Sequence, residues 1–227
     1  MVGPTDNAAP VTIAILAKAP VPGTVKTRLA MMLGVYGAAT LQERLILRTV
    51  EAAREAAAGP IHLWTHPDER HPLFKTLVEQ HGFPVARQPK GDLGTRIHTA
   101  LVHASGPAIV VGTDCPVLNA QHLRDAAEVL RSGTDAVVCP SDDGGYTLIG
   151  LRKPEPALFK DMAWGTDSVM TETRHRLTHL GLSWREPAQL WDINRPTDVR
   201  RLRREGPKEL LEGIDHDVSP LRVVGRE

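Results

Sequence analysis

The stretch Val11-Thr-Ile-Ala-Ile-Leu-Ala17 runs directly into Lys18-Ala-Pro-Val-Pro-Gly-Thr-Val-Lys-Thr-Arg28, and these two segments decide the fold class. The first is a nearly continuous apolar run, which is typical of a parallel strand buried on both faces. The second is a basic loop in which Pro20 and Pro22 restrict the backbone and Gly23 permits a turn. A buried strand that opens into a charged loop is the pattern expected at the ligand-binding edge of an α/β sheet.

Apolar runs and amphipathic stretches alternate along the rest of the chain. We predict further strands over residues 61–65, 83–87, 107–112, 135–139 and 146–151, with strand-like stretches in 184–193. We predict helices over residues 41–57, 73–80, 95–103, 119–130, 167–180 and 197–204. This alternation predicts a three-layer α/β/α, Rossmann-like fold with a mostly parallel mixed sheet. The expected parts are a flexible lead-in (1–10), one domain (11–206) and a C-terminal tail (207–227).

Composition and charge limit the classes of binding partner and the cellular compartment that we expect. Lys+Arg and Asp+Glu both total 27 among the 227 residues, so the formal net charge is zero. Nucleic-acid-binding proteins usually have a basic excess, and we therefore expect no nucleic-acid partner. Cys115 and Cys139 provide no disulfide framework and favour a reducing compartment. The run 11–17 is too short to span a bilayer and follows no basic segment, so we expect a cytoplasmic protein without a membrane span.

The basic loop after the first strand has the residue types of a phosphate site. Arginine binds phosphate as a planar fork and lysine as a point charge. The loop is neither a Walker motif nor a GxGxxG fingerprint, and an ordinary solvated loop is the alternative interpretation. A second glycine-bearing loop, residues 91–96, enters a predicted helix, and a plain helix start is equally compatible with it. The candidate nucleotide- and phosphate-binding residues are Lys18, Gly23, Lys26, Arg28, Gly91 and Gly94.

Carboxylates follow three other predicted strands. Asp114 comes after 107–112, and the stretch Asp142-Asp-Gly-Gly145 comes after 135–139. Strand alternation would place Asp192 and Asn194 on one face, where both oxygens can meet a single hard cation. Each has a simpler interpretation: Asp114 as a turn or cap residue, and the Asp-Asp-Gly-Gly stretch as a hairpin turn. Trp164, beside a glycine, is either a core residue or an aromatic ring that stacks on a ligand.

Taken in order, these motifs resemble a bacterial glycosyltransferase-like family of the GT-A, nucleotide-diphospho-sugar transferase superfamily. Some of its members are arsenosugar-biosynthesis-type glycosyltransferases. The chain is more distantly similar to molybdenum-cofactor guanylyltransferase and 2-phospho-L-lactate guanylyltransferase. The resemblance covers roughly residues 11–205 and rests on segments 17–29, 91–96, 112–116, 142–146, 148–150, 164–166 and 192–196.

The resemblance implies a GT-A fold and roles for several residues. Lys18, Lys26 and Arg28 would hold phosphates, and Asp114 would bind Mg²⁺ or Mn²⁺ at a strand end. Asp192 or Asn194 would complete the metal site. The family often has Asp where this chain has Asn194, and position 116 is Pro, so there is no Asp-x-Asp motif at Asp114.

Three functions remain open at this point. The leading expectation is a divalent-metal-dependent transferase that moves a sugar from a nucleotide sugar to a small-molecule acceptor. Asp142 or Asp143 would then take the acceptor proton, and Gly144, Gly145 and Trp164 would bind the substrate. The alternative is a guanylyltransferase-like nucleotidyltransferase, which couples a nucleoside triphosphate to a phosphorylated small molecule. The third is a non-catalytic nucleotide-binding module, which the two carboxylate positions argue against.

Overall fold

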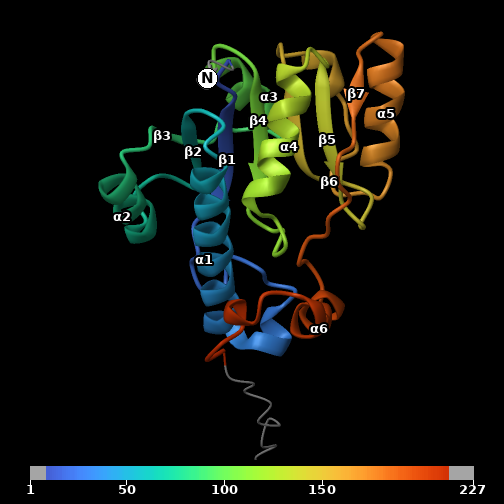
Figure 1. Ribbon diagram of the computed structural model, residues 1–227. Helices are drawn as coiled ribbons and strands as arrows, with labels where there is room; N and C mark the ends of the chain where they lie inside the picture. The colour runs from blue at the N-terminus through green and yellow to red at the C-terminus, as the bar shows by residue number, and fades with distance from the viewer. Residues whose placement is uncertain (1–8, 215–227) are drawn as a thin grey trace, which may run out of the picture.

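A seven-stranded sheet forms the centre of residues 9–214, the part of the chain that the computed structural model describes (Figure 1). The strand order is β3-β2-β1-β4-β6-β5-β7. β6 runs antiparallel to both of its neighbours, and the other neighbouring pairs are parallel. The strands are β1 (Thr12–Lys18), β2 (Ile61–His66), β3 (Val85–Arg87), β4 (Ala108–Gly112), β5 (Ala136–Pro140), β6 (Tyr146–Leu151) and β7 (Trp184–Arg185).

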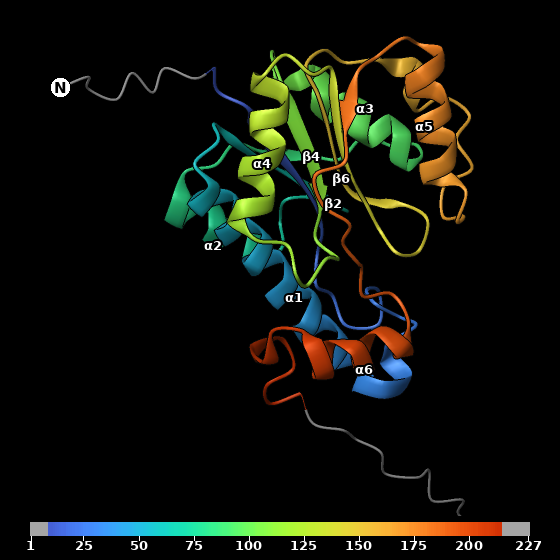
Figure 2. The same cartoon turned by 45° about the vertical axis from the view of Figure 1, so that its right-hand side comes forward.

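Helices cover both faces of the sheet, as Figure 2 shows. One face is covered by α1 (Ala30–Ala56), α2 (Pro72–His81) and α4 (Ala120–Arg131). The other is covered by α3 (Leu93–His103) and α5 (Val169–His179). The last helix, α6 (Pro196–Glu205), lies beyond the sheet and beside the start of α1. The prediction of a three-layer α/β/α fold with a mostly parallel mixed sheet is confirmed.

The alternation of side chains along β1 explains why the strand is apolar throughout. Ile13 and Ile15 pack into the core under α1 and α4, and Ala14 packs into the core under α3 and α5. A strand covered on both faces needs apolar residues at every position rather than at every second one.

The first helix begins eleven residues earlier than the apolar pattern predicts, at Ala30 rather than at residue 41. Its first turns are separated from the rest by Gly34, whose φ of 67° interrupts the helix. Leu29 and Leu33 are buried there against residues of the α6 region, Val199 among them. Packing against a segment far along the chain therefore stabilises this extension, and no local periodicity could show it.

The strand-like stretches predicted within 184–193 are present only in part. β7 has only two residues, and a single bridge between Ser141 and Leu190 continues the pairing. Pro187 interrupts the segment because proline has no N–H to donate to a ladder. Beyond Leu190 the chain leaves the sheet and crosses to α6.

The first part of the expected tail packs on the protein. Leu210 and Ile214 are buried against α1, and the Arg44 guanidinium donates hydrogen bonds to the carbonyls of Glu209, Leu210 and Glu212. Residues 1–8 of the expected lead-in and 215–227 of the tail lie outside the described residues.

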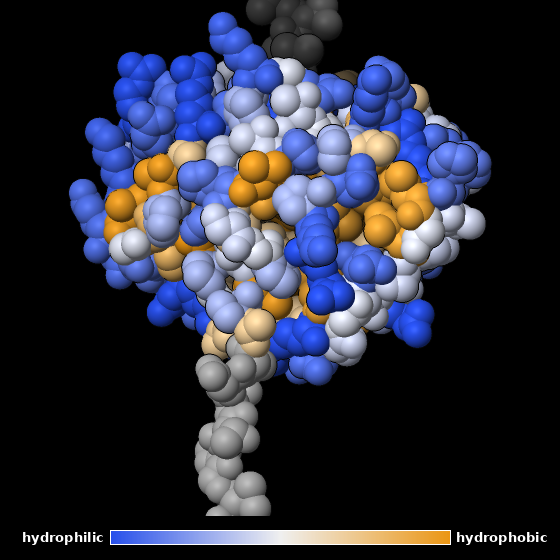
Figure 3. Space-filling view, turned by 90° about the horizontal axis from the view of Figure 1, so that it is seen from above, coloured by the Kyte–Doolittle hydropathy of each residue, from blue (hydrophilic) through white to orange (hydrophobic). Residues whose placement is uncertain are grey.

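The surface viewed from above in Figure 3 has hydrophobic residues in separate small areas between hydrophilic side chains. Small apolar areas of this kind are ordinary on soluble proteins. Within residues 9–214, none of the helices combines the length and the hydrophobicity that crossing a bilayer requires.

The turn between β5 and β6 is docked onto the start of α5 through Gly144. Gly144 has a φ of 88°, and a Cβ atom there would lie 2.2 Å from the carbonyl oxygen of Asp167. Its own carbonyl accepts a hydrogen bond from the backbone N–H of Met170 at 2.8 Å. At Gly145, in contrast, a Cβ would meet only a carboxylate oxygen of Asp143, at 3.3 Å. The turn therefore leaves no room for a side chain at Gly144, whereas a small side chain at Gly145 can be accommodated.

We predict that Gly144→Ala lowers the free energy of unfolding by about 2 kcal/mol or more, because it combines a left-handed backbone with a contact against the Asp167 backbone. In a domain of this size the melting temperature should fall by about 5 °C or more. Gly145→Ala is the matched control and should change it by about 2 °C or less. Equal melting temperatures for the two variants would contradict this account of the turn.

Candidate active site

The carboxyl ends of β1, β4 and β5 lie at one edge of the sheet, because these strands run in the same direction. The basic loop 19–28 follows β1, Asp114 follows β4, and the Asp142–Asp143 turn follows β5. The segment 190–195 crosses the same edge, where Ile193 N–H donates to the carbonyl of Asp114 at 2.9 Å. The structure thus brings together the loop and the carboxylates that the sequence singled out.

The basic loop is folded back on itself by contacts within the loop. Lys18 Nζ donates to the carbonyl of Thr24 at 2.7 Å, and Thr24 donates to the carbonyl of Val21 through both its N–H and its hydroxyl. Gly23 supplies the turn, with a φ of 78°. Lys26 also has a positive φ, of 46°, which is uncommon for a residue with a side chain. The turn directs the Lys26 side chain toward the carboxylates.

Lys26 is the central cation of the site. Its Nζ lies 2.7 Å from Asp114 Oδ1 and donates to the carbonyl of Ile193, also at 2.7 Å. The Lys26 side chain is only 5% exposed, whereas that of Asp114 is 45% exposed. An ammonium this enclosed is stable only when it is paired, so these contacts hold the loop on the other two segments.

Two further carboxylates, Asp192 and Asp143, lie close to the ion pair of Lys26 with Asp114. Burial, followed by the negative charges of Asp114 and Asp143, raises the pKa of Asp192 to about 7, and the charge of Lys26 acts in the opposite direction. Asp143 accepts hydrogen bonds from Gly145 N–H at 3.2 Å and from the Asn194 side-chain amide at 3.4 Å. One ammonium therefore faces a cluster with more negative charge than it can balance.

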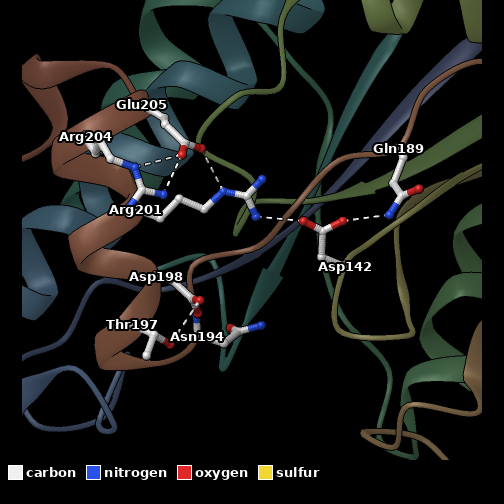
Figure 4. A network of polar contacts seen from close by, with 8 residues as sticks. All are labelled: Asp142, Gln189, Asn194, Thr197, Asp198, Arg201, Arg204 and Glu205. Carbon is white, nitrogen blue, oxygen red and sulfur yellow. Dashed lines mark hydrogen bonds and ion pairs between the residues drawn. The ribbon is translucent and has the colours of Figure 1, made fainter.

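Asp142 lies between Arg201 of α6 and Gln189, as Figure 4 shows. Its Oδ2 lies 2.7 Å from Arg201 Nη1, and its Oδ1 accepts from Gln189 Nε2 at 2.7 Å. Both contacts lower the pKa of Asp142, the Arg201 contact more than the Gln189 contact. Arg201 also donates to Glu205, and its guanidinium lies 4.5 Å from the centre of the Trp191 ring. The two adjacent aspartates thus occupy different environments.

A cavity of about 500 Å³ opens beside Lys26. Its polar wall carries five basic side chains, and its apolar side is formed by Leu16, Ile97, Val110 and Ile149. The basic residues are Lys18, Lys26, Arg28, His66 and Arg96. Burial and then the charges of Arg96, Lys18 and Arg87 lower the pKa of His66. A cation-rich wall above an apolar surface can bind the phosphates and the base of a nucleotide.

Sequence reasoning missed two residues of this wall, His66 and Arg96. His66 ends β2 at the same sheet edge, which is the signal that could have found it. The two glycines of the 91–96 loop do not line the cavity. Gly94 is buried, and a Cβ there would lie 2.9 Å from atoms of Phe159 and Trp164. Asp92 caps α3 by accepting a hydrogen bond from Thr95 N–H at 2.8 Å.

A second cavity, of about 600 Å³, adjoins the first. The two share five lining residues: Arg28, Leu93, Tyr146, Asp192 and Asn194. The second cavity is also lined by Asp142, Asp143, Gly145, Trp164, Arg195 and Arg201. Predicted phosphate-binding, carboxylate and substrate-binding residues therefore line two joined cavities that meet beside Asp192 and Asn194.

The side chains at this sheet edge include oxygen donors for a divalent metal. Among residues 9–214, no group of three or more His, Cys, Asp or Glu is arranged to hold a metal ion. The donor chemistry nevertheless suits a hard cation, because carboxylate and amide oxygens are its preferred protein ligands. Burial and then the charges of Asp114 and Asp143 raise the pKa of Asp192, and a bound cation would offset both effects. The oxygen ligands that these residues offer are of the type that Mg²⁺ or Mn²⁺ binds, and one of them, Asp114 Oδ1, forms an ion pair with Lys26.

Two curated proteins are similar to this chain. The 3-phospho-D-glycerate guanylyltransferase of Phenylobacterium zucineum is 28% identical over 192 residues, which cover 80% of this chain and 85% of that protein. The 2-phospho-L-lactate guanylyltransferase of Methanocella arvoryzae is 28% identical over 131 residues, which cover 58% of this chain and 53% of that protein. The second match thus spans about half of that relative. Both names favour the nucleotidyltransferase alternative over a nucleotide-sugar donor.

Two solved structures illustrate the same fold. A protein assigned as a nucleotide-diphospho-sugar transferase from Desulfovibrio desulfuricans has a TM-score of 0.75 and 25% identity, covering 91% of this chain and 99% of that chain. The 4-diphosphocytidyl-2C-methyl-D-erythritol synthase from Anaerococcus prevotii has a TM-score of 0.56 and 12% identity, covering 85% and 94%, and shows the fold alone.

These findings support a transferase rather than a non-catalytic nucleotide-binding module. They support the resemblance to nucleotide-diphospho-sugar transferases and to guanylyltransferases. They do not show the arsenosugar-biosynthesis subtype. The family DUF2064, described as uncharacterized proteins conserved in bacteria, matches residues 49–166, just over half of the chain, and the protein belongs to this family.

Proposed function

We propose that the protein is a divalent-metal-dependent nucleotidyltransferase that couples a nucleoside triphosphate, GTP in the first instance, to a phosphorylated small acid. The observation that carries the proposal is the pair of joined cavities, one walled by cations and both bordered by the carboxylates around Lys26. The names of the two guanylyltransferase relatives support the choice of GTP and of a phosphorylated acid.

The reaction would form one phosphoanhydride bond and break another. A phosphate oxygen of the acceptor attacks the α-phosphorus of the triphosphate, and the bond to the β-phosphate oxygen breaks. Pyrophosphate leaves with the electron pair of that bond. The second pKa of a phosphate monoester is about 6, so the nucleophile is already ionised at neutral pH. Neither Asp142 nor Asp143 then needs to remove a proton.

In this proposal, the first cavity holds the triphosphate through Lys18, Lys26 and Arg28, with Gly23 shaping the loop. Asp114 and Asp192 are the proposed metal ligands, and Asn194 adds an amide oxygen. When bound, Mg²⁺ or Mn²⁺ would neutralise charge on the phosphate oxygens.

The second cavity is the proposed acceptor site. Arg28, Arg195 and Arg201 line it and can pair with a phosphorylated acid, and Trp164 and Gly145 form part of its wall. Gly144 shapes it through the turn rather than by lining it. In the glycosyl-transfer alternative the acceptor is a hydroxyl, which needs a base. Asp143 is then the better base, because Arg201 already pairs with Asp142.

A panel experiment separates the two reactions. The protein is incubated with Mg²⁺ or Mn²⁺ and with GTP, ATP, CTP, UTP or the matching nucleotide sugars, with 3-phosphoglycerate and phospholactate as acceptors. We expect release of pyrophosphate from one triphosphate, only when an acceptor is present. Release of a nucleoside diphosphate from a nucleotide sugar would overturn the proposal in favour of glycosyl transfer, and an absence of turnover and of thermal stabilisation by every nucleotide would exclude both.

Arg28→Ala should weaken nucleotide binding without unfolding the protein. Arg28 is exposed, lines both cavities, and makes no hydrogen bond or ion pair with other described residues. A charge-assisted contact to phosphate is worth about 1.5–3 kcal/mol, so affinity measured by calorimetry should fall about ten- to hundredfold. Arg200→Ala, on the exposed side of α6, is the control and should keep wild-type affinity. Unchanged affinity in Arg28→Ala would remove this residue from the site.

Asp192 should make the stability of the metal-free protein depend on pH. Its pKa is about 7 in the folded protein, against an ordinary value of 3.8. The folded state therefore binds the proton more tightly, and its stability decreases as pH rises from about 4 to about 7. Asp192→Asn removes this decrease, so in EDTA the variant should melt several degrees above wild type at pH 8 and close to it at pH 5. If the melting temperatures of variant and wild type differ by the same amount at both pH values, the pKa of Asp192 is not raised in the folded protein.

A further inference from the structure

The position of Lys26 carries an inference beyond phosphate binding. Its ammonium already uses an Asp114 oxygen and the Ile193 carbonyl, both at 2.7 Å, and its side chain is almost fully enclosed. Its ammonium therefore faces Asp114 and the Ile193 carbonyl, although Lys26 also lines the first cavity. The other lysine of the loop behaves differently, because Lys18 donates to a carbonyl of its own loop.

An ammonium and a divalent cation have competing demands on the same oxygen. Asp114 Oδ1 is paired with Lys26, and the Asp114 side chain is 45% exposed and therefore accessible to a metal ion. Like charges that share one carboxylate repel each other, and the repulsion is strong where water is largely excluded. A triphosphate supplies several anionic oxygens that can accept the ammonium instead. Lys26 is therefore able to exchange one anionic partner for another.

We propose that Lys26 is an internal counter-ion that occupies Asp114 in the empty site and moves to the triphosphate when the metal and the nucleotide bind together. The inference rests on the proposed function, because it takes Asp114 as a metal ligand. Lys26 is then a positioning residue with two exclusive contacts, one in each state.

This exchange makes the two ligands cooperative. A metal ion alone must displace Lys26 from Asp114 without offering it another anion, and it binds weakly. A metal–nucleotide complex offers the phosphates as the new partner, and it binds tightly. Because linkage is reciprocal, the nucleotide also gains affinity from the metal. The arrangement would keep the site from filling with free metal ions before the nucleotide arrives.

Lys26→Met tests the proposal, because the two affinities should change in opposite directions. Mn²⁺ alone, followed by the electron paramagnetic resonance signal of the free ion, should bind about tenfold or more tightly to the variant. The preformed Mn²⁺–GTP complex, followed by calorimetry, should bind about tenfold or more weakly. Lys18→Met is the matched control: it removes a lysine from the same loop and should raise the affinity for Mn²⁺ alone less than threefold. A purely structural lysine would not increase metal affinity when lost.

The outcomes separate the inference from the function. If wild type binds Mn²⁺–GTP and Lys26→Met binds Mn²⁺ no more tightly than wild type, the counter-ion role is wrong and the proposed function stands. If wild type binds Mn²⁺ neither alone nor with GTP, both are overturned. A measurement on wild type covers a variant that does not fold: saturating Mn²⁺ should increase acetylation of Lys26 relative to Lys18, as followed by mass spectrometry, and an unchanged ratio contradicts the proposal.

Discussion

The contact between the Lys26 ammonium and Asp114 holds the candidate site together. The same ammonium binds the carbonyl of Ile193, and Ile193 in turn donates its N–H to the carbonyl of Asp114. Three segments that are far apart in the sequence, namely the loop after β1, the end of β4 and the strand-free stretch before α6, are thereby closed into one unit. Without this cation, Asp114 would lose its ion-pair partner and Asp192 a positive charge that lowers its pKa, while the negative charge of Asp143 would remain.

Apolar packing holds the acidic stretch in place from behind. Trp191 and Ile193 are buried in the cluster that joins α6 to the start of α1, whereas Asp192 and Asn194 line both cavities. The alternation that the sequence suggested is therefore real, although the stretch is not a strand. Burial of alternate residues against helices has the same effect on side-chain direction as pairing in a sheet. Hydrophobic contacts far from the chemistry thus determine where the polar side chains point.

The fold could be predicted from sequence because each buried strand of a parallel sheet is a short apolar run that local inspection finds. The strand-end rule then placed Asp114 and Lys26 at one edge, and the structure agrees on their position. The rest depended on contacts between distant residues. The pairing of Asp142 with Arg201 joins residues 59 apart in the chain, and the early start of α1 depends on packing against the α6 region. No local pattern contains such information.

The adjacent residues Asp142 and Asp143 show how this distant packing divides the roles of two identical side chains. Arg201 and Gln189 occupy both oxygens of Asp142, which makes it a link between the β5–β6 turn and α6. Asp143 keeps only weak contacts and faces the other carboxylates. A reaction that needed a base at this turn would need one carboxylate free of cations. A phosphate nucleophile needs none, since it is ionised already. Asp142, held in an ion pair, is unsuited to act as a base, so transfer to a hydroxyl at this turn would depend on Asp143, whereas a phosphorylated acceptor would need neither carboxylate as a base.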